Sequence, residues 1–198
     1  MFARQFDHVV DYKLQDVQPD HFRHAVINFF VEGGGGANVT LPHKPAAAEI
    51  VNDLSARAER ARAVNTIVRR SATELYGDNT DGAGLVTDLT RNLGVTLTGV
   101  RLLILGAGGA TRGVLAPLLE QEPREVRIAN RTPERAERIR DEFSDLGEIS
   151  ASGFSQIDDR PWDIVINATA ASLAGETPEL PPHAVGRDTV CYDMAYGS

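Results

Sequence analysis

An apolar run passes directly into glycines in Leu102-Leu103-Ile104-Leu105-Gly106-Ala107-Gly108-Gly109-Ala110, and this stretch sets the fold of the chain. The run is typical of a buried strand, and helix-forming residues follow from Gly109 onward. Glycines permit a tight turn, and the first N–H groups of a helix are unpaired donors that attract an anion. This order of strand, glycine turn and helix predicts a site for the pyrophosphate group of a dinucleotide. Thr111 takes the third glycine position of the usual fingerprint, so the match is partial.

Strand-like and helix-like segments alternate through the second half of the chain. The pattern predicts strands at 100–105, 125–129, 163–167 and 189–193, and helices at 109–121 and 133–143. Strands that are regularly separated by helices form parallel βαβ units. Residues 83–198 are therefore expected to form an α/β domain with a parallel sheet that binds a dinucleotide.

The residues after the second of these strands indicate which dinucleotide binds. An NAD site places Asp or Glu there, about 20 residues after the glycines, to accept hydrogen bonds from the ribose. This chain has Asn130-Arg131-Thr132-Pro133-Glu134-Arg135 instead. Arg131 and Arg135 can clamp a 2′-phosphate, and the charge of Arg135 in the first turn of a helix opposes the helix dipole unless an anion lies nearby. NADP is therefore favoured over NAD, and the alternative is that both arginines are solvated.

The first half of the chain has a different pattern. It predicts a helix at 19–31 and strands at 9–17, 37–41, 65–69 and 74–77, of which the last two form a hairpin. A further helix is expected to begin at Pro42, because apolar residues recur after it at helical spacing, at Ala46, Ile50, Val51 and Leu54. This half is expected to be a smaller α/β unit.

One predicted helix, 81–93, joins the two halves. Its apolar residues fall on one face, and Gly94 supplies the left-handed residue that ends it. We place the boundary near residue 82, which separates an N-terminal domain, 1–82, from a dinucleotide-binding domain, 83–198.

Polar residues gather where a predicted strand passes into a predicted helix, in Asn38-Val39-Thr40-Leu41-Pro42-His43-Lys44. The charge of Lys44 has the wrong sign for a helix N-terminus, so Lys44 needs an anionic partner. Asp81 is the best candidate because it lies where the two halves join, and the alternative is that it only caps the helix that follows. Asn65 and Thr66 add groups that donate and accept hydrogen bonds.

Composition excludes several classes of partner. With 20 basic and 28 acidic residues the net charge is −8, which argues against nucleic acid and against an anionic membrane surface. No apolar run is long enough to span a membrane, and residues 1–10 lack the pattern of a signal peptide, so a cytoplasmic location is expected. The histidines and Cys191 show no metal-ligand spacing, and Cys191, in an apolar run, is expected to be a buried thiol.

Six motifs occur in an order that resembles the shikimate dehydrogenase family. They are Gly36 to Lys44, Ala63-Val64-Asn65-Thr66, Gly77 to Gly82, Gly106 to Ala110, Asn130-Arg131-Thr132 and Tyr192 to Gly197. The resemblance covers essentially the whole chain, and the Asn-Val-Thr-x-Pro-x-Lys and Asn-Thr-Asp-Gly motifs are more specific than the glycine turn. It implies an α/β fold with two domains, an N-terminal αβ substrate domain and a C-terminal Rossmann-type NADP-binding domain with a parallel sheet.

The resemblance also implies a reaction. This is the NADPH-dependent reduction of 3-dehydroshikimate to shikimate, in the shikimate pathway of aromatic amino acid and chorismate biosynthesis. Hydride transfer to a carbonyl leaves an alkoxide, which a positioned ammonium group can stabilise and protonate. No metal is implied, and the resemblance allows a homodimer.

Residue roles follow from the same resemblance. Lys44 and Asp81 are implied to be the catalytic pair. Contacts with the substrate are expected from Thr40, Asn65, Asp81 and Tyr196. Contacts with NADP are expected from Gly106, Ala107, Gly108, Gly109, Ala110, Asn130, Arg131, Thr132, Arg135 and Met194.

Three features depart from the family. The chain starts after the first strand and the Ser-x-Ser segment that bind the substrate carboxylate in the family, and it stops before a helical tail. Each hydrogen bond from those serines to the charged carboxylate would contribute about 1.5–3 kcal/mol to substrate binding. Without these bonds we expect turnover to be reduced while NADPH binding is retained. Arg62 stands where the family commonly has glycine.

Two alternatives stay open. One is a quinate/shikimate dehydrogenase that uses NAD, which Arg131 and Arg135 disfavour because their charges would meet no phosphate. The other is a dehydrogenase-like module that binds a ligand without catalysis. Oxidation of NADPH with 3-dehydroshikimate, compared with quinate and NAD, distinguishes these hypotheses.

Overall fold

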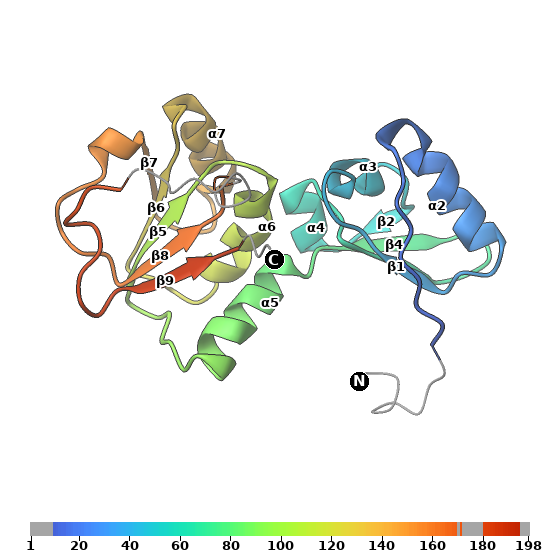
Figure 1. Cartoon of the computed structure of the whole chain (residues 1–198), viewed down its shortest axis with the longest axis horizontal. Helices are drawn as coiled ribbons and strands as arrows, with labels where there is room; N and C mark the ends of the chain where they lie inside the picture. Colours follow the sequence, from blue (N-terminus) through green and yellow to red (C-terminus); the bar gives the residue numbers. More distant parts are fainter. Residues whose placement is uncertain (1–9, 170, 172–179, 195–198) are drawn as a thin grey trace.

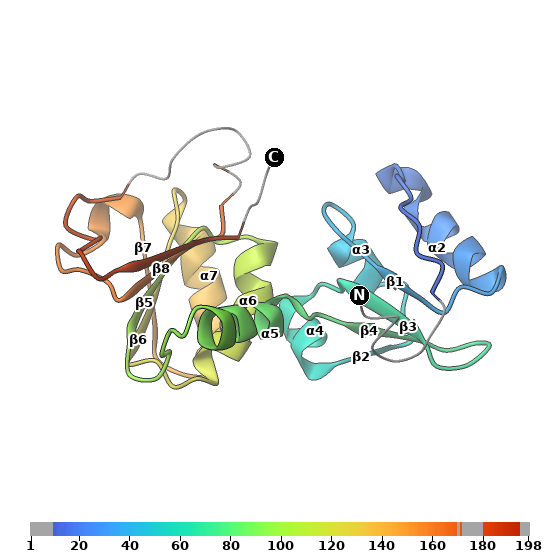
Figure 2. The ribbon, with the colours of Figure 1, turned by 60° about the horizontal axis from the view of Figure 1, so that its bottom comes forward.

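Two sheets organise the chain, and the helix α5 (Asp81–Thr87) joins them (Figure 1). The structure is a computed structural model, and it describes residues 10–169, 171 and 180–194. Figure 2 shows each sheet with its own helices on either side of α5. Within the described residues, no helix is both long and apolar enough to cross a membrane.

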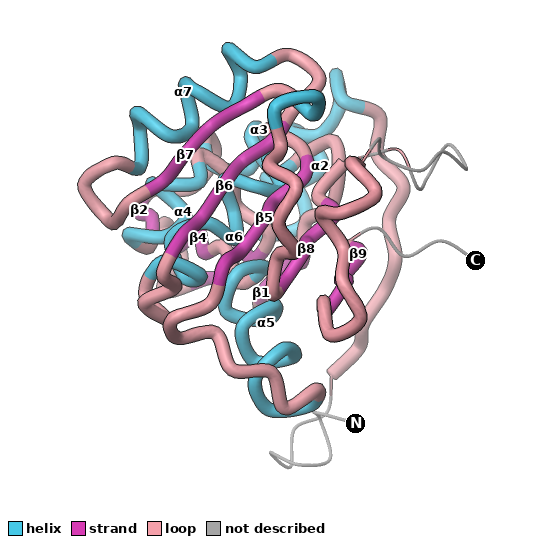
Figure 3. The backbone as a smooth tube through the Cα atoms, turned by 90° about the vertical axis from the view of Figure 1, so that its left-hand side faces the viewer, coloured by secondary structure: helices cyan, strands magenta, loops and turns pink. Residues whose placement is uncertain are grey.

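All five strands of the second sheet run parallel, in the order β7-β6-β5-β8-β9 (Figure 3). The strands are β5 (Arg101–Leu105), β6 (Glu125–Ala129), β7 (Ile149–Ser152), β8 (Ile164–Asn167) and β9 (Val190–Asp193). The helices are α6 (Gly109–Leu119) and α7 (Pro133–Phe143), and a 3-10 turn, η3 (Phe154–Gln156), follows β7. The four predicted strands and both predicted helices are confirmed to within two residues at each end. The strand β7 was not predicted, because Ile149 is its only residue with a strong preference for strands.

The side chains of β5 are buried on both faces of the sheet. Leu102 and Ile104 pack into the apolar cluster that includes residues of α6 and α7. Leu103 and Leu105 point to the other face, where they pack with Trp162. Burial on both faces is why this strand has a continuous apolar sequence rather than an alternating one.

The first sheet is mixed, in the order β1-β3-β4-β2. Its strands are β1 (Gly36–Asn38), β2 (Asp53–Leu54), β3 (Thr66–Arg69) and β4 (Leu75–Asp78). Its helices are α2 (Phe22–Val31), which follows the 3-10 turn η1 (Pro19–His21), α3 (Lys44–Ala48) and α4 (Ala56–Ala61). The antiparallel pairing of β3 with β4 confirms the predicted hairpin, and β2 pairs parallel to β4.

The predicted helix 19–31 corresponds to η1 and α2. Its residues Phe22, Val26 and Phe30 are buried and pack with Ile67 of β3. Phe29, an apolar residue of the same helix, is 37% exposed. The buried face of α2 therefore does not include all of its apolar residues.

The strand predicted at 9–17 is wrong for residues 10–17, which form neither strand nor helix. Val10, Tyr12 and Leu14 are exposed, and Leu14 is 95% exposed. The alternation of apolar and polar residues resembles a strand, but no described strand pairs with this segment. A strand needs a partner for its backbone hydrogen bonds, and the sequence pattern alone does not supply one.

The segment around Lys44 also differs from the prediction. The strand predicted at 37–41 ends at Asn38. The helix predicted from Pro42 begins at Lys44, and Pro45 takes the first-turn position that was assigned to Pro42. Proline fits the first turn of a helix because the N–H it lacks has no partner there.

The same helix is shorter than predicted, since it ends at Ala48. The backbone N–H of Asn52 donates to Leu75 of β4, and the side chain of Asn52 accepts from the Leu75 N–H. These bonds draw the chain into the sheet as β2 instead of extending the helix. The apolar residues after Ala48 still pack against the same core, from a loop and a strand: Ile50, Val51 and Leu54.

The helix that joins the sheets ends as predicted. After α5 the chain continues in a π-helical turn, η2 (Asp88–Asn92), and Gly94 follows with a positive φ of +67°. Near its start, α5 lies so close to α6 that a Cβ at Gly82 would stand 2.6 Å from Pro117 Cγ and 2.7 Å from the Gly113 carbonyl oxygen. The domain boundary at residue 82 stays a prediction; it falls in the first turn of α5.

Cys191 was predicted to be buried, but it is exposed. It lies on β9, the last strand in the order of the second sheet. The prediction was wrong because the apolar run around Cys191 does not reveal that, among the described residues, this strand is at an edge of the sheet.

Arg62 ends α4 in a backbone conformation that favours glycine. Its φ is +52°, and its N–H donates to the Glu59 carbonyl oxygen over 3.1 Å. The side chain is 71% exposed, and its nearest carboxylate, Glu142, is 3.6 Å away. The glycine that the family commonly has at this position is explained by the backbone, not by a contact.

We expect Arg62→Gly to raise the free energy of unfolding by about 0.5–1 kcal/mol, because glycine adopts positive φ without the steric cost of a Cβ. The exposed ion pair that is lost contributes little. Arg62→Ala keeps the Cβ and lacks the ion pair, so its stability should stay within about 0.5 kcal/mol of the parent. Urea unfolding followed by circular dichroism measures both, and a less stable Arg62→Gly than Arg62→Ala would contradict the explanation.

Candidate active site

The N-termini of two helices bring Lys44 and Asp81 together. Lys44 is the first residue of α3, Asp81 is the first residue of α5, and Lys44 Nζ lies 2.8 Å from Asp81 Oδ2. The two side chains are 23% and 25% exposed, so a ligand can reach a pair that is partly shielded from water. The carboxylate offsets the unfavourable interaction of Lys44 with the α3 dipole. Thr80, rather than Asp81, is the N-cap residue of α5.

Asn65 orients the carboxylate of Asp81. Its Nδ2 donates to Asp81 Oδ1 over 2.8 Å, and its Oδ1 accepts from the Thr80 N–H over 3.0 Å. The hydroxyl of Thr66 also donates to Asn65 Oδ1, over 2.8 Å. The two oxygens of Asp81 therefore have separate partners, Asn65 on one and Lys44 on the other.

The helix α6 passes beside this ion pair. The position that a Cβ would take at Gly113 lies 3.6 Å from Asp81 Oδ2 and 3.4 Å from the side-chain amide of Asn79. Gly113 is one helical turn, about 6 Å along the axis, from Gly109 at the start of α6. The Lys44–Asp81 pair is thus close to the glycine turn that the sequence identified.

The glycine turn has the backbone that a bound anion needs. Gly106 has a φ of +102°, and a Cβ there would stand 3.1 Å from the Ala168 carbonyl oxygen. Around Gly108 and Gly109 a Cβ would meet no atom within 4 Å, and Gly108, as N-cap, has no side chain to bond the first N–H groups of α6. Those donors are open to a ligand.

Thr111 explains the partial match of the glycine fingerprint. Its side chain is fully buried, and its hydroxyl donates to the Gly106 carbonyl oxygen over 2.8 Å. A side chain at this position therefore holds the turn from inside. Ala107 and Ala110, the other residues expected at the cofactor, are half-buried beside it.

Arg131 and Arg135 lie at the same end of the sheet as the glycine turn, because β6 runs parallel to β5 and they follow it. Both are exposed, and among the described residues neither forms an ion pair. Thr132 is the N-cap of α7, and Asn130 Nδ2 donates to its carbonyl oxygen over 2.9 Å. The two guanidinium groups are therefore available to an anion.

The remaining predicted residues have fewer contacts that fix their positions. Thr40 is exposed, just after β1, and no hydrogen bond of its hydroxyl is present among the described residues. Met194 follows β9 and packs partly against the core of the second sheet. Tyr196 lies outside the described residues. Within those residues, no group of three His, Cys, Asp or Glu side chains could hold a metal ion.

Asp78 belongs to this region as well, although the sequence did not single out its role. Its Oδ1 accepts from Ser55 Oγ over 2.6 Å and from Arg57 Nε over 2.7 Å, and its Oδ2 lies 2.5 Å from Arg57 Nη2. The hydrogen bonds from Arg57, with those from Ser55 and the Asn79 N–H, lower the pKa of Asp78 to about 2 despite partial burial. The quoted motif contains Asp78, but its partners lie 21 and 23 residues away in a helix that was not predicted.

Two family models match the chain. One describes the shikimate dehydrogenase substrate binding domain and matches residues 1–67. The other describes shikimate / quinate 5-dehydrogenase and matches residues 88–179. The two matches divide the chain near the point where α5 joins the sheets.

The chain is also similar, over nearly its whole length, to individual proteins. A shikimate dehydrogenase (NADP(+)) of Methylococcus capsulatus is 49% identical over all 198 residues, which span 71% of that protein. The crystal structure of an Ael1 enzyme from Pseudomonas putida matches 99% of the chain and 72% of its own, with 38% identity and a TM-score of 0.92. Shikimate 5-dehydrogenase from Thermus thermophilus, in complex with NADP(H) and shikimate, matches 96% of the chain and 69% of its own, with 28% identity and a TM-score of 0.80.

We expect Asp78→Asn to be less stable than the parent at neutral pH, by an amount that shrinks in acid. A carboxyl whose pKa is lower in the folded than in the unfolded chain, here about 2 against about 3.9, stabilises the fold above the unfolded pKa. That contribution is lost as the pH falls through about 4 toward 2. Thermal unfolding midpoints of both proteins across this range measure the effect, and a difference independent of pH would contradict it.

Proposed function

The chain belongs to the shikimate dehydrogenase (NADP(+)) family, and we propose that it reduces 3-dehydroshikimate to shikimate with NADPH through Lys44 and Asp81. Membership makes it an oxidoreductase of the shikimate pathway that uses NADP. One observation carries the proposal: Asp81 bonds Lys44 over 2.8 Å and lies beside α6, one turn from the glycine turn.

The residues around the glycine turn fit the charges of NADP. The open N-terminus of α6 would hold the pyrophosphate, and Arg131 and Arg135 would hold the 2′-phosphate. Asn130 and Thr132 shape the loop that carries the arginines. When bound, NADPH supplies the hydride.

Lys44 supplies the proton in this proposal. As the carbonyl is reduced, negative charge develops on its oxygen, and an ammonium group stabilises that charge and then donates a proton to form the hydroxyl. Asp81 holds the ammonium in place through Oδ2, while Asn65 holds Asp81 through Oδ1. Lys44 is left neutral and recovers its proton from water.

The hydroxyl groups of the substrate need partners that both donate and accept. Asn65 and the hydroxyl of Thr40 have that capacity, as does Tyr196, which lies outside the described residues. We assign these residues, with Asp81, to the substrate. The alternative that the chain only binds a ligand predicts no turnover with any substrate.

We expect Lys44→Met to lower kcat for 3-dehydroshikimate by roughly 100-fold or more, which is typical of the loss of a general acid. Asp81→Asn keeps the shape of the side chain and should lower kcat as well, while KM for NADPH stays within about twofold for both, because neither residue is assigned to NADP. The decay of NADPH absorbance measures the rate. A folded Lys44→Met enzyme with parental kcat would refute the assignment.

We expect Arg131→Ala and Arg135→Ala to raise KM for NADPH by roughly 10-fold or more each, since a charged hydrogen bond contributes about 1.5–3 kcal/mol. KM for NADH, which has no 2′-phosphate, should change little. Arg138→Ala, on the same helix, is the matched control, because Arg138 donates to the Glu134 carbonyl oxygen and not to a ligand. Equal effects on NADPH and NADH would favour the alternative of a quinate dehydrogenase that uses NAD.

Two further expectations stay predictions. They are the cytoplasmic location and the homodimer. Sedimentation equilibrium of the purified chain tests the second.

A further inference from the structure

A second ion pair fixes the chain segment that carries Asp81. The helix α4 contributes both side-chain partners of Asp78: Ser55, its N-cap, and Arg57, in its first turn. Arg57 bonds both oxygens of Asp78, over 2.7 and 2.5 Å, and Ser55 Oγ bonds the first of them over 2.6 Å. Two bonds from one planar guanidinium define an orientation as well as a distance, which a single contact does not.

The segment between Asp78 and Asp81 has only two residues, Asn79 and Thr80, and both are held. The side chain of Asn79 is 1% exposed, donates to the Ala63 carbonyl oxygen over 3.1 Å and accepts from the Asp81 N–H over 3.2 Å. The N–H of Thr80 donates to Asn65. The position of Asp81 is therefore tied to that of Asp78, and Asp78 is tied to α4.

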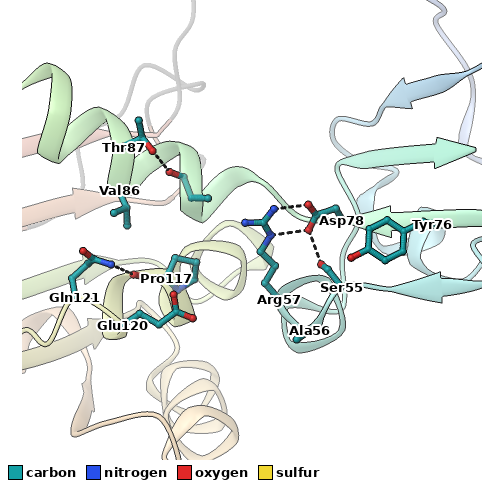
Figure 4. A pocket seen from close by; sticks show the side chains of 11 residues that line it. Ser55, Ala56, Arg57, Tyr76, Asp78, Val86, Thr87, Pro117, Glu120 and Gln121 are labelled. Carbon is teal, nitrogen blue, oxygen red and sulfur yellow. Dashed lines mark hydrogen bonds and ion pairs between the residues drawn. The ribbon is translucent and has the colours of Figure 1, made fainter. Parts of the chain in front are cut away.

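Arg57 and Asp78 border a space that Lys44 does not border. They line a cavity of about 590 Å³ between α4 and β4 on one side and α5 and α6 on the other (Figure 4). Neither Lys44 nor Asp81 lines it, and its opposite wall includes Pro117 and Glu120 of the segment around the end of α6. Arg57 can therefore affect Lys44 and Asp81 through the 78–81 segment, not through contact with a ligand.

We propose that Arg57, clamped on Asp78, is a positioning residue that holds Asp81 in contact with Lys44. The expected effect on turnover rests on the proposed function. The expected effect on the Lys44–Asp81 contact does not. The two bonds from Arg57 fix, on the cavity side, the angle between the end of β4 and the start of α5. Without these bonds that angle is no longer fixed there. The Asp81 carboxylate then shifts, and Lys44 loses the partner that aims its ammonium group.

The kinetic test compares three substitutions in the full chain. Arg57→Ala removes the clamp, Arg57→Lys keeps the charge without the bidentate geometry, and Arg70→Ala is the control, because it removes another ion pair of the first sheet, Arg70–Asp53 at 2.8 Å. We expect kcat for 3-dehydroshikimate to fall roughly 10- to 100-fold in Arg57→Ala, as for a misplacement of about 1 Å, with KM for NADPH unchanged. Arg57→Lys should recover part of the loss, and Arg70→Ala should match the parent.

A double-mutant cycle shows whether Arg57 acts through Asp81. If it does, Arg57→Ala should lower kcat much less in an Asp81→Asn background than in the parent, because the group it positions is already gone. A purely structural role would lower the melting temperature and leave kcat per folded molecule unchanged. Additive losses of kcat would overturn the proposal.

A second readout does not depend on turnover. Lys13 and Lys44 are the two lysines of the chain, so acylation by an amine reagent, followed by mass spectrometry, reports Lys44 with Lys13 as internal reference. Loss of the contact with Asp81 uncovers the nitrogen, so Arg57→Ala should speed the acylation of Lys44 toward the rate of Asp81→Asn. Asp78→Asn, which removes the partner of Arg57 and adds no lysine, gives the same test should Arg57→Ala not fold.

The two readouts separate the two proposals. A parent chain that does not reduce 3-dehydroshikimate, but whose Lys44 acylation responds to Arg57→Ala and not to Arg70→Ala, would refute the proposed function and support the clamp. Normal turnover with Lys44 acylation unchanged in every folded Arg57 and Asp78 variant would refute the clamp and leave the function standing.

Discussion

The rest of the site depends on one ion pair, between Lys44 and Asp81. Its two opposite charges lie at the starts of two helices that belong to different parts of the chain. A carboxylate is favourable at a helix N-terminus and an ammonium is not, so the contact with Asp81 offsets the unfavourable position of Lys44. The four-residue segment from Asp78 to Asp81 must therefore be held accurately. Its polar groups are bonded by Asn65, Ala63, Ser55 and Arg57, which come from both sides of the segment.

Close packing at the same place brings the second sheet to this pair. The start of α5 and the middle of α6 approach so closely that Gly82 and Gly113 have no room for a side chain or only just enough. The glycine of the Asn-Thr-Asp-Gly motif is thus a packing requirement, because a Cβ at Gly82 would overlap Pro117. This approach places the glycine turn one turn of α6 from Asp81, so a dinucleotide at that turn and the proposed catalytic pair could share one substrate.

The two ends of the parallel sheet carry different kinds of residues. At the carboxyl ends of the strands lie the glycine turn and the exposed Arg131 and Arg135, as is usual for ligand sites in such sheets. At the opposite end, Arg101 is 5% exposed, bonds Glu125 and Asp158, and stacks over the Trp162 ring with its guanidinium carbon 4.1 Å from the ring centroid. Burial opposes the charge of Arg101, but the two carboxylates outweigh it and raise its pKa. These buried ion pairs therefore lie at the end of the sheet opposite the residues that we assign to NADP.

Elements with local signals could be read from the amino-acid order without any coordinates. The apolar run of β5, the glycines at its end, and Thr132 with Pro133 at the start of α7 each act within a few residues, so these elements were predicted nearly to the residue. Features that depend on distant neighbours became visible only in the folded chain. Residues 10–17 lack a strand partner among the described residues, Cys191 is exposed on an edge strand, and Arg57 meets Asp78 from a helix 21 residues away. Strand pairing and ion pairs between remote segments depend on which surfaces meet after folding. The periodicity of residues along the chain does not predict which surfaces these are.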